Sequence, residues 1–148
     1  MASVRVPPRW VERLAWRIHR GIYRLSRGHL GLWRPRPGRW GSMRLIVTGR
    51  RSGQDRAVIL AYLDDGPNLV TLAMNGWWPG EPLWWLNLQA HPAARVQLKG
   101  ETRQVRGRPA TGDERDRLWA AFGQIDKKLD EYAALRPVPT AVVVLEPA

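Results

Sequence analysis

The sequence has no cysteine among its 148 residues, which excludes disulfides, thiolate nucleophiles and thiolate-bound metals. Its three histidines, at positions 19, 29 and 91, have no ligand-like spacing, so we expect no metal site. No apolar run approaches the length of a transmembrane helix, and no signal peptide is evident. We therefore expect a cytoplasmic protein in which any redox chemistry depends on a bound cofactor.

Acidic residues are nearly missing from the first third of the chain. Residues 1–51 hold thirteen arginines against a single acid, Glu12, which gives a net charge of +12. The remaining residues hold eleven Lys plus Arg against twelve acids, for a net charge of −1. This asymmetry predicts that the N-terminal region meets an anionic partner: membrane lipid, nucleic acid or an anionic ligand.

A basic amphipathic helix is predicted over residues 9–27. Its apolar positions recur every four residues, and its arginines form a second stripe; these are Trp10, Leu14, Ile18 and Ile22, and Arg13, Arg17, Arg20, Arg24 and Arg27. Two interpretations stay open. The helix lies on an anionic membrane surface, which would place the protein peripherally on the inner face of the cell membrane, or it packs against its own domain with the arginines in water.

Residues 28–42 are rich in Gly, Pro, Arg and Trp and predict an irregular connector. Its Trp33 and Trp40 could stack nucleobases, but we favour their covering the open end of a core. Nucleic-acid binding is therefore the less favoured function. We divide the chain into residues 1–42, the basic helix and connector, and residues 43–148, a near-neutral folded domain.

A hairpin is predicted around the turn Gly49-Arg-Arg-Ser-Gly53, between apolar runs at 45–48 and 57–63. Arg50, Arg51 and Arg56 surround backbone N–H groups and the Ser52 hydroxyl in this turn. Guanidinium groups beside open amides form a receptor for phosphate or carboxylate, although an ordinary solvated turn would have the same composition. The glycine spacing matches neither a phosphate-binding loop nor a dinucleotide fingerprint.

Further strands are predicted at 68–74, 94–99, 102–108 and 140–146, with helices at 83–90, from 111 to about 122, and at 126–135. Thr111 and Glu114 have the spacing of a capping box. About six short strands, mostly in hairpins, predict an α+β fold that is mainly β, an antiparallel barrel carrying helices.

Five motifs, in unbroken order over residues 43–147, resemble the deazaflavin-dependent nitroreductase family of coenzyme F420-dependent quinone and nitro reductases. They are Thr48-Gly-Arg-Arg-Ser-Gly-Gln-Asp-Arg56, Asn75-Gly76, Pro82-Leu-Trp-Trp-Leu-Asn-Leu-Gln-Ala-His-Pro92, Ala110-Thr-Gly-Asp-Glu-Arg115 and Val142-Val-Val-Leu-Glu-Pro147. The resemblance implies a split β-barrel, related to flavin-binding barrels, that holds F420.

The resemblance also implies which residues bind the cofactor. The basic turn would hold the phosphate and oligoglutamate tail, through Arg50, Arg51, Ser52, Gly53 and Arg56. The ring would be lined by Ala57, Val58, Ile59, Leu60, Ala61, Ala73, Met74, Asn75, Leu83, Trp84, Trp85 and Asn87. For Trp84 and Trp85 the alternative is simple core packing, and Asn87 would either orient the ring or cap its own helix.

The implied reaction is hydride transfer from reduced F420 to a quinone-like or nitroaromatic acceptor, with the chemistry supplied by the cofactor. Relatives carry several tyrosines at the acceptor site, whereas residues 122–132 keep only Tyr132, and Trp77 and Trp78 replace smaller residues. Tyr132 is thus a candidate acceptor-site residue, and no catalytic residue is assigned. FMN, or another anionic ring cofactor, in the same fold is the alternative to F420.

Overall fold

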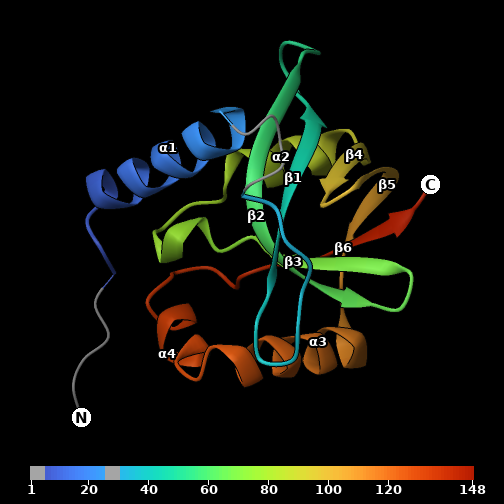
Figure 1. Ribbon diagram of the computed structural model, residues 1–148. Coiled ribbons are helices and arrows are strands. Elements are labelled where there is room, and N and C mark those ends of the chain that lie inside the picture. The colour runs from blue at the N-terminus through green and yellow to red at the C-terminus, as the bar shows by residue number, and fades with distance from the viewer. Residues whose placement is uncertain (1–5, 26–30) are drawn as a thin grey trace.

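The structure, a computed structural model, describes residues 6–25 and 31–148. In this part of the chain, six antiparallel strands close into a barrel in the order β1-β2-β3-β6-β5-β4, and four α-helices lie around it (Figure 1). Figure 1 shows α1 and α2 on the upper side of the view and α3 and α4 on the lower side. The predicted α+β fold with a six-stranded antiparallel barrel is confirmed.

The central hairpin consists of β1 (Gly41–Thr48) and β2 (Asp55–Asp65), in register from Gly41 opposite Tyr62 to Thr48 opposite Asp55. β1 begins earlier than predicted, inside the segment expected to be irregular. A Cβ atom on Gly41 would lie only 2.6 Å from the Tyr62 ring and 2.7 Å from the Trp33 carbonyl oxygen. Glycine here therefore permits close packing inside a strand, although its type alone suggested a connector.

The remaining strands complete the barrel. β4 (Ala93–Leu98) pairs with β5 (Glu101–Pro109) as the second predicted hairpin. β3 (Asn68–Leu72) pairs with β6 (Val142–Pro147), and β6 pairs with β5, while β4 returns to β1. The chain end is thus inserted between β3 and β5, which closes the cylinder.

The apolar run of β6 is buried on both of its faces. Val143 and Leu145 belong to the cluster that fills the barrel, together with Met43, Leu45 and Val96 among others. Val142 and Val144 belong to a second, outer cluster. Because strand side chains alternate between faces, a strand covered on both sides is continuously apolar. This explains why the sequence shows no alternation at this strand.

The helices contribute apolar side chains to both clusters. α2 (Leu83–Ala90) contributes Trp84, Trp85 and Leu88 to the barrel interior. α3 (Gly112–Ile125) and α4 (Leu129–Ala133) contribute Leu118, Phe122 and Leu129 to the outer cluster. α4 is shorter than the predicted helix over 126–135.

The predicted capping box at the start of α3 is wrong. Thr111 occupies the N-cap position but makes no side-chain hydrogen bond to the helix. The Glu114 carboxylate instead accepts hydrogen bonds from Arg108 Nη1 and Nη2, at 2.6 and 2.9 Å. A bidentate ion pair with a guanidinium is stronger than a single neutral cap, so Glu114 is drawn to β5.

α1 (Arg9–Leu25) contacts the loop 75–78 by one side, and the described part of its apolar stripe is exposed. The Arg9 guanidinium lies 5.6 Å from the Trp78 ring centroid, and the Glu12 carboxylate lies against Gly76. Trp10, Leu14 and Ile18 are 70%, 48% and 56% exposed. The predicted continuation to Arg27 and the side chains of Arg20, Ile22 and Arg24 lie outside the described residues.

The described part of the predicted connector, residues 31–40, is a small hairpin rather than an irregular segment. Bridges join Trp33 to Ser42 and Arg36 to Arg39. Trp40 packs against the outer cluster, and the Trp33 indole nitrogen donates to the Trp40 carbonyl at 3.1 Å. Among the residues described, no helix is both long and apolar enough to cross a membrane.

Candidate active site

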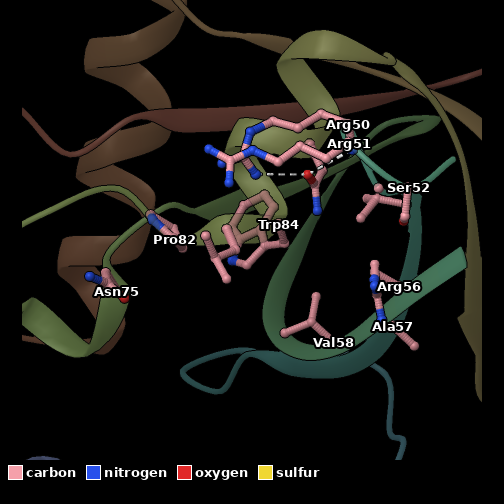
Figure 2. A pocket seen from close by; sticks show the side chains of 13 residues that line it. Arg50, Arg51, Ser52, Arg56, Ala57, Val58, Asn75, Pro82 and Trp84 are labelled. Carbon is pink, nitrogen blue, oxygen red and sulfur yellow. Dashed lines mark hydrogen bonds between the residues drawn. The ribbon is translucent and has the colours of Figure 1, made fainter. Parts of the chain in front are cut away.

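A cleft of about 640 Å³ opens between the β1–β2 turn, the start of β2 and the segment leading into α2 (Figure 2). Ten of the predicted cofactor residues line it: Arg50, Arg51, Ser52, Arg56, Ala57, Val58, Asn75, Leu83, Trp84 and Asn87. Val47, Gly49 and Pro82 also line it, although they were not among the predicted cofactor residues. The structure therefore brings together predicted residues from three separate segments of the chain.

The other predicted residues do not line the cleft, namely Gly53, Ile59, Leu60, Ala61, Ala73, Met74 and Trp85. Ile59, Ala73 and Trp85 are buried, with 4%, 0% and 3% of their surface exposed. The cleft reaches only the start of β2, from Arg56 to Val58, and the next residue, Ile59, belongs to the core. Tyr132 is also outside it: its ring stacks on Trp77, with centroids 5.8 Å apart and an interplanar angle of 12°.

The basic turn has a fixed backbone shape. The Gly49 amide donates to the Gln54 carbonyl at 2.8 Å, and the Gly53 amide donates to the Gly49 carbonyl, also at 2.8 Å. Gly53 has φ of +71°, a left-handed conformation that glycine adopts without strain. A Cβ atom on Gly49 would lie 2.6 Å from Ser52 Oγ, which itself accepts the Gln54 amide at 3.2 Å. The glycines are thus required by the tightness of this turn.

Asn87 connects the turn to α2. Its Oδ1 accepts hydrogen bonds from the backbone N–H and from Nη1 of Arg50, both at 3.1 Å (Figure 2). The side chain is 7% exposed and lies inside α2, so it does not cap its own helix. Asn87 instead fixes the position of the turn relative to the helix that carries Trp84.

The positive charge of the turn is not neutralised by neighbouring carboxylates. Arg51 and Arg56 are exposed and form no ion pair with any described residue. The carboxylate closest in sequence, Asp55, accepts a hydrogen bond from Arg95 Nη2 at 2.7 Å. With that carboxylate engaged by β4, the two guanidinium groups keep their donors for an anion.

The opposite wall of the cleft is apolar. Trp84 is 9% exposed and packs against Trp85, with ring centroids 6.2 Å apart and planes tilted by 58°. Val58 faces the same space from β2, and Leu83 lies at the mouth with 68% exposure. Trp85 thus belongs to the core, in agreement with the alternative of simple core packing. Trp84 belongs to the core and also lines the cleft.

This combination of an antiparallel barrel, an arginine-rich turn and an aromatic wall defines a class of protein that can bind a flat ring joined to an anionic group. The chain belongs to the F420H(2)-dependent quinone reductase family, whose model matches residues 15–147. The predicted resemblance is confirmed, and so is the predicted oxidoreductase activity at the level of the family.

Known proteins show the same relationship. An F420H(2)-dependent quinone reductase of Mycobacterium tuberculosis strain H37Rv is 31% identical over 144 residues, covering 93% of this chain and 95% of the relative. A solved F420-H2 dependent reductase matches with a TM-score of 0.65 at 24% identity, over 71% of this chain and 93% of its own. A solved domain-swapped dimer matches with a TM-score of 0.67 at 22% identity, over 90% of this chain and 99% of its own. At these identities the two structures establish the fold alone.

Proposed function

We propose that the protein passes a hydride from reduced coenzyme F420 to a quinone-like acceptor and that the cleft holds the deazaflavin. The observation that carries the proposal is the presence of two complementary surfaces in one cleft. Arg51 and Arg56 offer uncompensated charge, and the wall around Trp84 offers an apolar plane. F420 joins a flat ring to a phosphate and glutamate tail, and so it matches both surfaces.

Each part of the cleft then has a definite task. The guanidinium groups of Arg51 and Arg56 bind the anionic part of the cofactor, and Asn87 keeps the turn in place through Arg50. Trp84 and Val58 exclude water from one side of the ring. The bound deazaflavin supplies the hydride. Among the residues lining the cleft there is no histidine, carboxylate or tyrosine, so a proton for the acceptor comes from solvent or from the acceptor site.

The test is a parallel titration of the purified protein with oxidised F420 and with FMN, followed by tryptophan fluorescence. Micromolar or tighter binding of F420, weaker binding of FMN and turnover of a soluble naphthoquinone with reduced F420 are the expected results. Preference for FMN would retain the fold and replace the cofactor. If the protein binds neither F420 nor FMN, the arginine turn is an ordinary solvated loop. Turnover of a nitroaromatic compound, but not of quinones, would change the acceptor class.

We also propose that α1 places the enzyme at an anionic membrane surface, where a lipid-soluble acceptor would be met. The support is the exposure of Trp10, Leu14 and Ile18 on a helix whose Arg13 and Arg17 are also exposed. One side of the same helix contacts the loop 75–78 beside the cleft, through Arg9 and Glu12. A helix bound to lipid in this way would bring the cleft close to the bilayer.

Co-sedimentation with vesicles tests this second proposal. Binding to phosphatidylglycerol vesicles should exceed binding to phosphatidylcholine vesicles, and a Leu14→Glu/Ile18→Glu variant should lose it. Leu135→Glu is a matched control, because Leu135 has the same 48% exposure as Leu14 but lies after α4. Equal binding by all three proteins would contradict the proposal. Salt-sensitive binding to DNA or RNA in place of vesicle binding would support the nucleic-acid alternative.

A further inference from the structure

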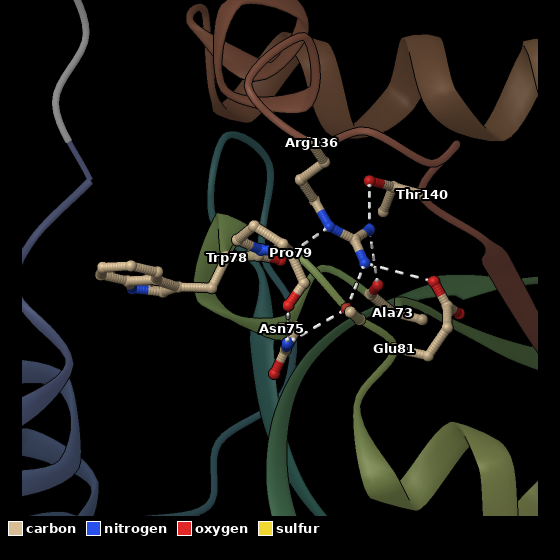
Figure 3. Close-up of polar contacts among 8 residues, drawn as sticks. Ala73, Asn75, Trp78, Pro79, Glu81, Arg136 and Thr140 are labelled. Carbon is tan, nitrogen blue, oxygen red and sulfur yellow. Dashed lines mark hydrogen bonds and ion pairs between the residues drawn. The ribbon is translucent and has the colours of Figure 1, made fainter.

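Arg136, which follows α4, is the most deeply buried guanidinium group in the described ion pairs, with no exposed side-chain surface. Its hydrogen bonds converge on the segment that joins β3 to α2 (Figure 3). Nε donates to the Trp78 carbonyl at 3.1 Å, Nη1 to the Ala73 carbonyl at 3.1 Å and to Thr140 Oγ1 at 2.7 Å, and Nη2 to the Gly80 carbonyl at 2.7 Å and to Glu81 Oε1 at 3.2 Å.

These five bonds use all five N–H donors that a guanidinium possesses. Four of the five acceptors are neutral, and three of them are backbone carbonyls of one loop, residues 73–81. Burying a charged group is costly unless all of its donors have acceptors. Every donor of Arg136 has one. Arg136 consequently has no donor left for a ligand, and its hydrogen bonds act on the shape of the loop.

The loop adopts a conformation that needs such support. Asn75, Gly76 and Trp77 are three consecutive residues with positive φ, at 51°, 62° and 65°. A non-glycine residue in this region is strained and persists where the surroundings over-determine it. Arg136 bonds to carbonyls on both sides of the three residues, and Tyr132 stacks on Trp77 from the same C-terminal segment.

Asn75 is the residue of this loop that lines the cleft. Its Nδ2 donates to the carbonyls of Pro79 and Gly80, at 3.2 and 3.1 Å. Carbonyl oxygens only accept, so the amide nitrogen must face them and Oδ1 occupies the other branch (Figure 3). The Gly80 carbonyl also accepts the hydrogen bond from Arg136 Nη2, at 2.7 Å. The guanidinium and the Asn75 amide are therefore joined through one atom.

We propose that Arg136 is a positioning residue for the candidate active site: it holds the loop so that Asn75 presents its amide oxygen to the cleft as a hydrogen-bond acceptor. The matching ligand group is an N–H or O–H donor on the bound ring system or on the reduced acceptor. This inference rests on the proposed function, because Asn75 lines the same cleft as Arg51 and Trp84. The sequence offered no sign of it, since Arg136 is distant from every motif of the cleft.

The experiment compares Arg136→Lys with Arg108→Lys in the full-length protein. Arg108 is a matched control, because it makes three hydrogen bonds to Glu114 and Glu146 but does not line the cleft. Hydrogen exchange of the free protein should show faster exchange of residues 74–81 in Arg136→Lys only. With reduced F420, kcat/KM for a soluble naphthoquinone should fall about ten- to hundredfold in Arg136→Lys, as displaced active-site groups do, at a temperature where the variant is folded.

A double-mutant cycle with Asn75→Ala separates positioning from general stability. If Arg136 acts through Asn75, then Asn75→Ala/Arg136→Lys should be no slower than Asn75→Ala alone. Arg108→Lys should leave kcat/KM unchanged in both backgrounds. Additive losses, or a lower melting temperature with unchanged kcat/KM and F420 affinity in Arg136→Lys, would show that Arg136 has a structural role only. If Arg136→Lys does not fold, Thr140→Val removes one of the five bonds and should shift the same readouts less.

The outcome for the wild-type protein keeps the two proposals distinguishable. A wild type that neither binds F420 nor reduces a quinone overturns the proposed function and the active-site role of Arg136 together. A wild type that is active, beside an Arg136→Lys variant with unchanged kinetics and unchanged exchange in residues 74–81, overturns the role of Arg136 alone.

Discussion

On one side of the cleft, Arg51 and Arg56 extend from the β1–β2 turn, exposed and without an ion pair among the described residues. On the other side, Arg136 lies buried against the loop 73–81, and each of its N–H groups has an acceptor. The same side chain therefore offers charge to a ligand in one place and stabilises backbone in the other. The difference lies in which acceptors the fold brings near, and not in the residue type.

Arg50 is intermediate between these two cases. Its Nη1 and its backbone N–H are bound by Asn87 Oδ1, which leaves other donors of the guanidinium facing the cleft. A neutral amide acceptor holds the arginine without cancelling its charge. We therefore predict that the positive potential of the cleft depends on keeping carboxylates away from the turn, which the Asp55–Arg95 pair achieves.

The largest effect is expected from removing an uncompensated arginine. Arg51→Ala should weaken binding of oxidised F420 by about 1.5–3 kcal/mol, roughly ten- to hundredfold, because it deletes charge-assisted hydrogen bonds. Fluorescence titration measures the change, and the melting temperature should stay close to that of the wild type. Arg106→Ala is the control, as Arg106 is exposed on β5 and outside the cleft. Equal affinity in both variants would remove the turn from the binding site.

A smaller effect is expected when a carboxylate is placed beside the turn. Asn87→Asp keeps an oxygen for both hydrogen bonds from Arg50 but adds a negative charge in the cleft. The added repulsion should weaken F420 binding by roughly 1 kcal/mol, without loss of the fold. Titration at several salt concentrations measures it, and the difference from wild type should shrink as screening increases. An unchanged affinity would mean that the anionic part of the cofactor binds elsewhere.

Sequence reasoning predicted the barrel and the receptor turn because both depend on local patterns. The turn 49–53 shows its glycines and arginines within five consecutive residues, and β-branched runs flank it. The sequence did not show which of these arginines would form hydrogen bonds within the protein. That depends on Asn87 and Arg95, which are distant in sequence and arrive only when α2 and β4 pack beside the turn.

The loop opposite the turn was less predictable for the same reason. The motif Asn75-Gly76 and the tryptophans after it were noted in the sequence, but the left-handed residues 75–77 lie between two carbonyls that Arg136, more than fifty positions later, binds. The run from Ala57 to Ala61 was assigned to the cleft as a block, whereas only its first two residues line it and the strand enters the core at Ile59.

Arginines paired with an exposed carboxylate form a third arrangement, and we expect the smallest effect there. Glu101 Oε1 accepts hydrogen bonds from Arg103 Nη2 and Arg34 Nη2, both at 2.7 Å, and these hold the Glu101 pKa at about 2, below its usual 4.5. Since the pKa is lower in the folded state, the stabilisation is present above pH 4.5 and is lost as the pH falls from 4.5 towards 2.

Glu101→Gln should therefore lower the melting temperature slightly at pH 7, because exposed pairs contribute little, and the gap from wild type should close as the pH approaches 2. Arg51→Ala should instead follow the wild-type profile at every pH, since Arg51 forms no ion pair with the described carboxylates. Thermal unfolding of the three proteins between pH 7 and 2 measures both. A constant gap for Glu101→Gln would show that the ion pairs add no pH-dependent stability, and a gap that closes for Arg51→Ala would show that the turn arginine has a carboxylate partner.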